Sequence, residues 1–170
     1  MGARRAVKRA LILAGAAVAS FNLWMFMPPG ALPFIAYAWG IVAVALAVQR
    51  LAPFPDEALP FVWLPAVAAT AAALAGDAMM ARLMFGPGLV ALALIATSVA
   101  TDWPMRAFAL GIWTEPAMWF AGNVAPKLYG PEVATSAFGQ AFGAWGGPTQ
   151  WLIIFLAYAA AWYNLKVNRA

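Results

Sequence analysis

One acidic residue stands in the middle of an apolar stretch, in the tetrapeptide Trp113-Thr114-Glu115-Pro116. A charged side chain at the centre of a bilayer costs about 2.5–3.5 kcal/mol on insertion scales, so Glu115 must face the protein interior, have a partner or carry a proton. The pattern predicts a proton- or cation-coupled site or a ligand anchor. The structural alternative is a hydrogen bond between helices. Its candidate partners are Thr70, Thr97, Ser98 and Asn22.

Helical spacing places Glu115 on a face that combines aromatic, small and flexible side chains. That face consists of Phe108, Gly111, Ile112, Glu115, Met118, Trp119 and Gly122. Glycines allow a second helix to approach closely, so we expect the carboxyl group at a helix–helix contact. The candidate ligand or proton site therefore comprises Glu115, Trp113, Trp119, Thr114, Met118 and, on another apolar stretch, Asp77. For Asp77, an interfacial ion pair with Arg82 is the structural alternative.

The nine tryptophans fall into two groups. Five lie near the ends of apolar stretches and are expected to anchor the chain at the membrane interface, because an indole ring is apolar and its N–H is polar. These are Trp24, Trp103, Trp145, Trp151 and Trp162. The other four, Trp39, Trp63, Trp113 and Trp119, lie deeper. They are expected either to pack against helices and lipid or to wall a pocket for a flat or cationic ligand.

The chain contains neither cysteine nor histidine. These two absences exclude disulfides, thiolate nucleophiles, zinc sites built on Cys or His, and haem held by histidine. No P-loop or dinucleotide motif is present, and no second carboxyl group is aligned with Glu115 for catalysis. We therefore expect no catalytic residues, no metal site and no cofactor held by His or Cys. A bound lipid, carotenoid or quinone stays open, because apolar and aromatic side chains can hold one.

The composition indicates a membrane protein. Of 170 residues, 65% are apolar and only 9% are charged, whereas soluble domains have about 45–50% and about 25%. Too few charges are available to cover a soluble surface. This excludes a soluble enzyme, a nucleic-acid-binding domain and a disordered chain. The predicted fold class is all-α: a polytopic helical membrane bundle forming one domain over residues 1–170.

Six apolar stretches are long enough to cross a bilayer, which takes about 20 residues each. We expect spans near 9–27, 31–49, 60–80, 83–100, 105–123 and 149–165, with a short amphipathic interfacial helix near 131–145. Proline and glycine at 28–30 end the first span, and the polar stretch 50–60 is a loop. Asp102 followed by Pro104 predicts a helix start. The third break is placed at a tight turn near Ala81-Arg82, with a kinked, re-entrant segment as the alternative.

The lysines and arginines predict the orientation. Eight of the ten basic residues lie in segments that share one side if the N-terminus is inside. The positive-inside rule then places both termini in the cytoplasm, in an inner (plasma) membrane of bacterial type. The basic N-terminus followed by an apolar run resembles a secretory signal. Because hydrophobicity continues beyond it, we expect an uncleaved first helix.

Two main functional hypotheses follow. The first is a non-catalytic subunit or assembly partner of a larger inner-membrane complex, energy-transducing or containing pigment or quinone. It rests on the alanine-rich faces of the first and third spans and on the shortage of reactive groups. Its partners would be membrane lipid and other integral membrane subunits, with no nucleic acid. The second is a small-molecule transporter or substrate-capture subunit that binds a hydrophobic or cationic ligand through Glu115 and nearby tryptophans. A lipid-modifying enzyme is third.

Overall fold

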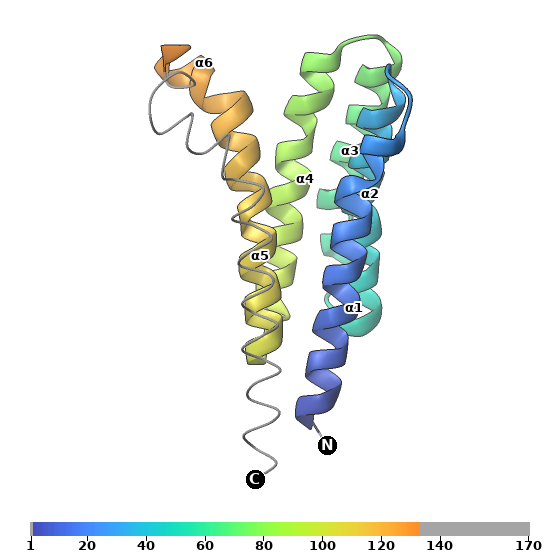
Figure 1. The fold of residues 1–170 in the computed structure, drawn as a ribbon, viewed down its shortest axis with the longest axis vertical. Coiled ribbons are helices and arrows are strands. Elements are labelled where there is room, and N and C mark those ends of the chain that lie inside the picture. Colours follow the sequence, from blue (N-terminus) through green and yellow to red (C-terminus); the bar gives the residue numbers. More distant parts are fainter. Residues whose placement is uncertain (1, 133–170) are drawn as a thin grey trace.

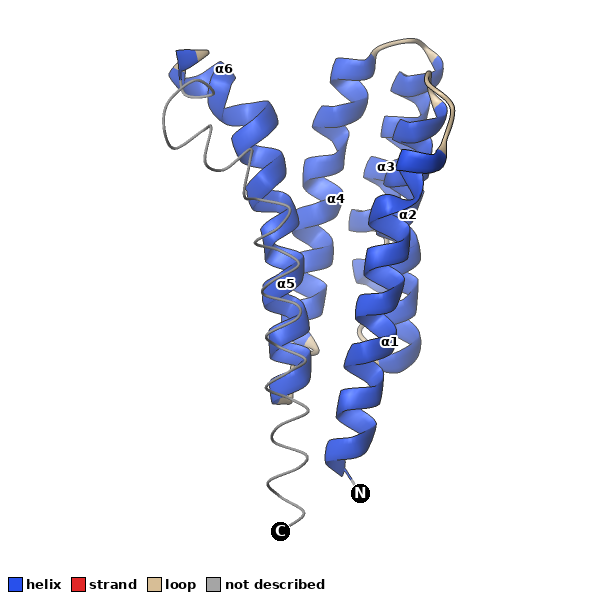
Figure 2. Ribbon diagram, viewed as in Figure 1, coloured by secondary structure: helices blue, strands red, loops and turns tan. Residues whose placement is uncertain are grey.

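The computed structural model describes residues 2–132, and this part of the chain is helical, with no strand (Figure 2). The elements are α1 (Gly2–Asn22), the 3-10 turn η1 (Leu23–Phe26), α2 (Leu32–Leu51), the 3-10 turn η2 (Asp56–Ala58), α3 (Pro60–Leu74), α4 (Ala78–Ser98), α5 (Trp103–Trp119), the π-helical turn η3 (Phe120–Val124) and α6 (Ala125–Tyr129). Three predicted features lie outside the described residues. They are the span 149–165, nearly all of the interfacial helix 131–145, and the anchors Trp145, Trp151 and Trp162.

Helices α1 to α5 alternate in direction and form a bundle (Figure 1). We call the end that holds the start of α1 the N-terminal end, and the opposite end, which holds η1, the η1 end. Helix α2 packs against α1, α3 and α4, and α5 packs against α4 and α1. Four helices, α1, α2, α4 and α5, therefore surround one central region.

Four helical stretches in the described part are long and apolar enough to cross a membrane: Arg5–Phe26, Leu32–Leu51, Asp56–Leu74 and Ala78–Ser98. Large apolar side chains such as Leu46, Leu64 and Leu94 are exposed on their outward faces. Such outward faces suit a lipid environment, because lipid tails are as apolar as leucine. The prediction of an all-helical membrane protein is confirmed at this level.

Small residues let the helices approach one another closely. In α1 the buried face includes Ala14 and Ala17, and in α3 it includes Ala66 and Ala69. A Cβ atom on Gly40 of α2 would lie 2.7 Å from the Ser20 carbonyl oxygen of α1. This distance is too short for a real contact, so the α1–α2 packing depends on glycine at this position.

The break between the third and fourth helices differs from the prediction. It lies at Ala75–Asp77, not near Ala81-Arg82, and α4 is a continuous helix rather than a re-entrant segment. Gly76 adopts φ +79°, a conformation that glycine takes without strain. The Asp77 carboxylate accepts a hydrogen bond of 2.9 Å from the Met80 N–H and caps α4. The overlooked sequence signal was Asp77, because an aspartate directly before apolar residues can cap the start of a helix.

The start of α5 agrees with the prediction. Asp102 is the N-cap, and its side chain accepts a 3.0 Å hydrogen bond from the Met105 N–H. Pro104 occupies the first turn, where a missing N–H has no cost. The cap fixes where α5 begins, and the helical repeat then fixes which residues face the bundle.

The connection between α2 and α3 is held by one amide side chain. Gln49 accepts a 3.0 Å hydrogen bond from the Phe54 N–H and donates one of 2.5 Å to Asp56.

We expect Gln49→Glu to lower the free energy of unfolding by about 1–2 kcal/mol, because glutamate cannot donate to Asp56 and repels it. Thermal unfolding in detergent would measure this. Adding Asp56→Asn should restore stability, since an amide would again donate; no recovery in the double variant would contradict this account.

Candidate functional site

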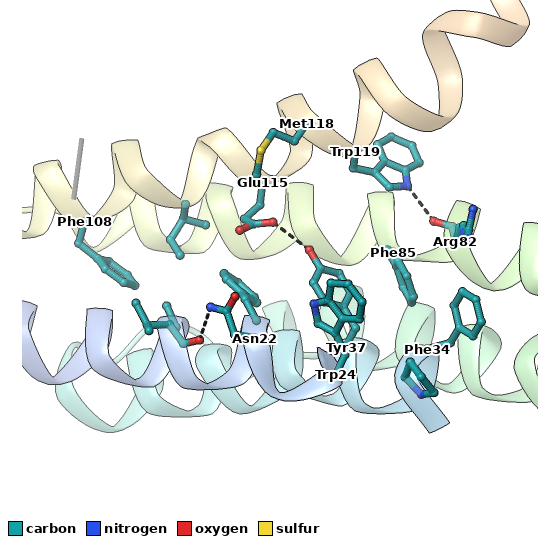
Figure 3. A pocket seen from close by; sticks show the side chains of 15 residues that line it. Asn22, Trp24, Phe34, Tyr37, Arg82, Phe85, Phe108, Glu115, Met118 and Trp119 are labelled. Carbon is teal, nitrogen blue, oxygen red and sulfur yellow. Dashed lines mark hydrogen bonds between the residues drawn. The ribbon is translucent and has the colours of Figure 1, made fainter. Parts of the chain in front are cut away.

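A cavity of about 580 Å³ lies between α1, α2, α4 and α5, toward the η1 end (Figure 3). Its lining is largely apolar, and seven of the described lining residues are aromatic. These are Phe21, Trp24, Phe34, Tyr37, Phe85, Phe108 and Trp119. The volume falls within the range of about 300–1,000 Å³ that is usual for small-molecule sites.

Glu115 projects from α5 into this cavity and is buried, with 7% of its surface exposed. The Tyr37 hydroxyl group, from α2, donates a hydrogen bond of 2.8 Å to the Glu115 Oε2 (Figure 3). The expectation that the carboxyl group faces the interior and has a partner is met. Tyr37, however, is not among the four candidate partners. The bonded residues are 78 positions apart in the sequence, so the bond connects α2 to α5. It holds the carboxyl group in one orientation.

The four expected partners are engaged elsewhere. Thr70 accepts from the Trp39 indole at 3.1 Å, and Thr97 accepts from the Trp113 indole at 2.9 Å. Ser98 and Asn22 donate to backbone carbonyl groups of their own helices. Threonine and serine hydroxyl groups commonly bond to a carbonyl three or four residues earlier, which leaves them local rather than interhelical.

Aromatic rings from three helices form a continuous wall beside the carboxyl group. The centroids of Phe21 and Tyr37 are 5.9 Å apart, those of Tyr37 and Phe85 are 4.8 Å apart, and those of Phe34 and Phe85 are 6.4 Å apart. These spacings match attractive ring pairs. At the outer end of the wall, the guanidinium carbon of Arg82 lies 5.5 Å from the Phe34 centroid, in a cation–π contact.

Trp119 lines the cavity near its η1 end and packs against α4. Its indole N–H donates a 2.8 Å hydrogen bond to the Arg82 carbonyl oxygen (Figure 3). The ring occupies the space above Gly86, where a Cβ atom would overlap the ring carbons. The absence of a side chain at Gly86 therefore leaves the space that the indole ring fills. The hydrogen bond to Arg82 holds the ring in this position, which we call its seat on α4.

The predicted site residues separate into two groups in space. Glu115, Met118 and Trp119 line the cavity together, as their spacing predicted. Trp113 is 38% exposed and lies on the opposite side of α5, while Thr114 bonds to the Gly111 carbonyl oxygen of its own helix. Asp77 caps α4 and is not a lining residue.

The structure also locates the remaining tryptophans and Gly122 relative to the cavity. Trp39 and Trp63 are exposed and are absent from the described lining, so neither walls the cavity. Trp24, expected only as an anchor, is both exposed and part of the lining. Trp103 is exposed at the start of α5, as an anchor would be. A Cβ atom added at Gly122 would meet none of the described residues within 4 Å, so no described helix approaches it closely.

Tyr37, Phe34, Phe85 and Arg82 were missed from the sequence. One signal was available: a tyrosine hydroxyl group inside an apolar helix needs a hydrogen-bond partner. The depth of Tyr37 relative to Glu115 follows only from how α2 and α5 pack. Arg82 was assigned to an ion pair with Asp77, but no ion pair joins them in the described structure; its guanidinium lies over Phe34 instead.

The side chains that line the cavity offer groups for binding a ligand. Within residues 2–132, no three His, Cys, Asp or Glu side chains gather to hold a metal ion. The described lining offers one carboxyl group, one phenol hydroxyl group, one carboxamide group, one guanidinium group, two indole groups and further ring faces. Such a set can hold an apolar molecule and compensate a charge.

No family model matches the chain, and no curated protein or solved structure matches it either. The function is therefore argued from the geometry of the cavity.

Proposed function

We propose that this protein captures a small hydrophobic or cationic molecule within the membrane, as a transporter or substrate-capture subunit. The observation that supports this is the buried Glu115 carboxyl group, oriented by Tyr37 inside an aromatic cavity of about 580 Å³. A carboxyl group that served only to join two helices would need no such cavity, because protein interiors are otherwise packed with few voids larger than a water molecule.

The distribution of basic residues supports the proposed topology of six spans with both termini cytoplasmic in a bacterial-type inner membrane. Arg5, Lys8, Arg9, Arg50 and Arg106 belong to helix ends at the N-terminal end of the bundle. Arg82 and Lys127 belong to segments at the η1 end. With the N-terminal end on the cytoplasmic side, the positive-inside rule is obeyed. The cavity then lies toward the opposite face.

A fifth span is part of this topology. Helices α5 and α6 and the turn η3 form one helical run from Trp103 to Tyr129. That run exceeds the about 20 residues needed to cross a bilayer. Its Asp102 cap lies at the N-terminal end of the bundle, and its last turns lie at the η1 end (Figure 1).

Binding of a fluorescent apolar amine tests the proposal. We expect 1-aminoanthracene to show a saturable fluorescence increase with the full chain in nanodiscs, above its partition into lipid. Val18→Trp should weaken this saturable binding at least about tenfold, because Val18 lines the cavity and the indole would fill it.

Val67→Trp is the matched control, since Val67 is 45% exposed on α3 and is not a lining residue. It should bind the dye as the parent protein does. Equal affinity in the parent and Val18→Trp, or no saturable signal in the parent, would overturn the proposal.

The role of a non-catalytic subunit is the second candidate, and one observation favours it. Gly15 and Ala19 are both exposed on α1, and a Cβ atom on Gly15 would meet none of the described residues within 4 Å. A small-xxx-small face of this kind suits close approach of another membrane helix. A stoichiometric integral membrane partner after purification in mild detergent, lost in Gly15→Leu, would support it. A bound lipid, carotenoid or quinone remains a prediction.

A further inference from the structure

The charges along the cavity are placed unevenly. Glu115 lies inside, buried and bonded to Tyr37, whereas Arg82 is exposed at the η1 end, over Phe34. Among the described lining residues, Glu115 is the acidic one and Arg82 is the basic one. A ligand in the cavity therefore meets a carboxyl group between Phe108 and Trp119 and a guanidinium group at the η1 end.

The ring wall connects these two groups. It consists of Phe34, Phe85, Tyr37 and Phe21, with neighbouring centroids 4.8–6.4 Å apart. Aromatic faces carry negative charge density and attract cations. Arg82 already occupies the Phe34 end of this wall. The Tyr37 end of the wall lies beside the Glu115 carboxyl group.

We propose that the ligand is an amphipathic organic monocation. Its ammonium-type charge lies beside Glu115 and the Tyr37 ring, and its apolar body extends along Phe85 toward Phe34. Arg82 repels a second positive charge at the outer end, so the site discriminates against dications. This inference rests on the proposed capture function and specifies the charge and polarity of its ligand.

Displacement of 1-aminoanthracene from the full chain in nanodiscs tests the charge. The three competitors are benzyltrimethylammonium, its uncharged carbon analogue neopentylbenzene, and the dication 1,4-bis(trimethylammoniomethyl)benzene. We expect the monocation to compete at least about tenfold better than neopentylbenzene, after correction for lipid partition. In Glu115→Gln this preference should fall to about threefold or less, with both competitors compared in the same variant.

The dication tests the role of Arg82. It should compete at least about tenfold more weakly than the monocation, and Arg82→Gln should reduce that difference to about threefold or less. This substitution keeps the backbone carbonyl that holds Trp119, so the cavity wall is retained. The control is the loss of one exposed basic residue elsewhere, Arg50→Gln, which should change neither ratio.

The outcomes separate the two proposals. Saturable dye binding with neopentylbenzene competing as well as the monocation would overturn the monocation while leaving capture of an apolar molecule intact. A dication that competes equally in the parent would overturn the role of Arg82. An absence of saturable dye binding in the parent would instead remove the capture function itself.

Discussion

Gly86→Ala is expected to lower the free energy of unfolding by about 1–3 kcal/mol, although alanine favours helices over glycine by about 0.8–1.0 kcal/mol. A Cβ atom at position 86 would overlap the indole ring of Trp119. The ring is rigid and is tied to the Arg82 carbonyl oxygen, so it must leave its seat on α4. Thermal unfolding in detergent, followed by size-exclusion chromatography, measures the loss.

Gly15→Ala provides the control for this prediction. Gly15 is also inside a helix and is exposed, and a Cβ atom added there would have no neighbour within 4 Å in the part of the chain that the structure describes. Alanine there should be neutral or stabilising. In a background carrying Trp119→Ala, Gly86→Ala should lose its cost, because the overlapping ring is gone. Equal stability of Gly86→Ala and Gly15→Ala would show that Trp119 is not seated on Gly86.

Tyr37→Phe is expected to cost about 1–2 kcal/mol of stability, because it removes the hydroxyl group that donates to the buried Glu115 carboxyl group. The ring wall is retained, since phenylalanine has the same ring. A double-mutant cycle with Glu115→Gln should give a coupling free energy of similar size. Unfolding in detergent of the parent, the two single variants and the double variant supplies the four values.

Tyr129→Phe is the matched control, since Tyr129 is 68% exposed on α6. The same loss of one hydroxyl group should leave stability within about 0.5 kcal/mol of the parent there. A coupling free energy near zero between Tyr37 and Glu115, or an equal effect at position 129, would argue against a hydrogen bond that orients the carboxyl group.

Several features of the fold could be predicted from short stretches of the sequence, without knowledge of how the helices pack. Apolar length predicted the four helices that are long and apolar enough to cross a membrane, because crossing a bilayer requires an uninterrupted apolar run whatever its neighbours. Asp102 and Pro104 predicted the start of α5, because capping depends on adjacent residues alone. The turn at Gly76 was missed, since apolar residues flank it closely and the hydropathy pattern barely changes.

The sequence alone predicted that Glu115 would face the protein interior, have a partner or carry a proton, because a charged side chain at the centre of a bilayer is costly. It also placed Met118 and Trp119 beside Glu115, through the helical repeat. The tertiary structure decided the rest: Tyr37 as the partner, the ring wall from α1, α2 and α4, and the seat of Trp119 on Gly86. Those contacts depend on the relative depth and rotation of helices distant in the chain, and apolar periodicity specifies neither, because lipid accepts any apolar face.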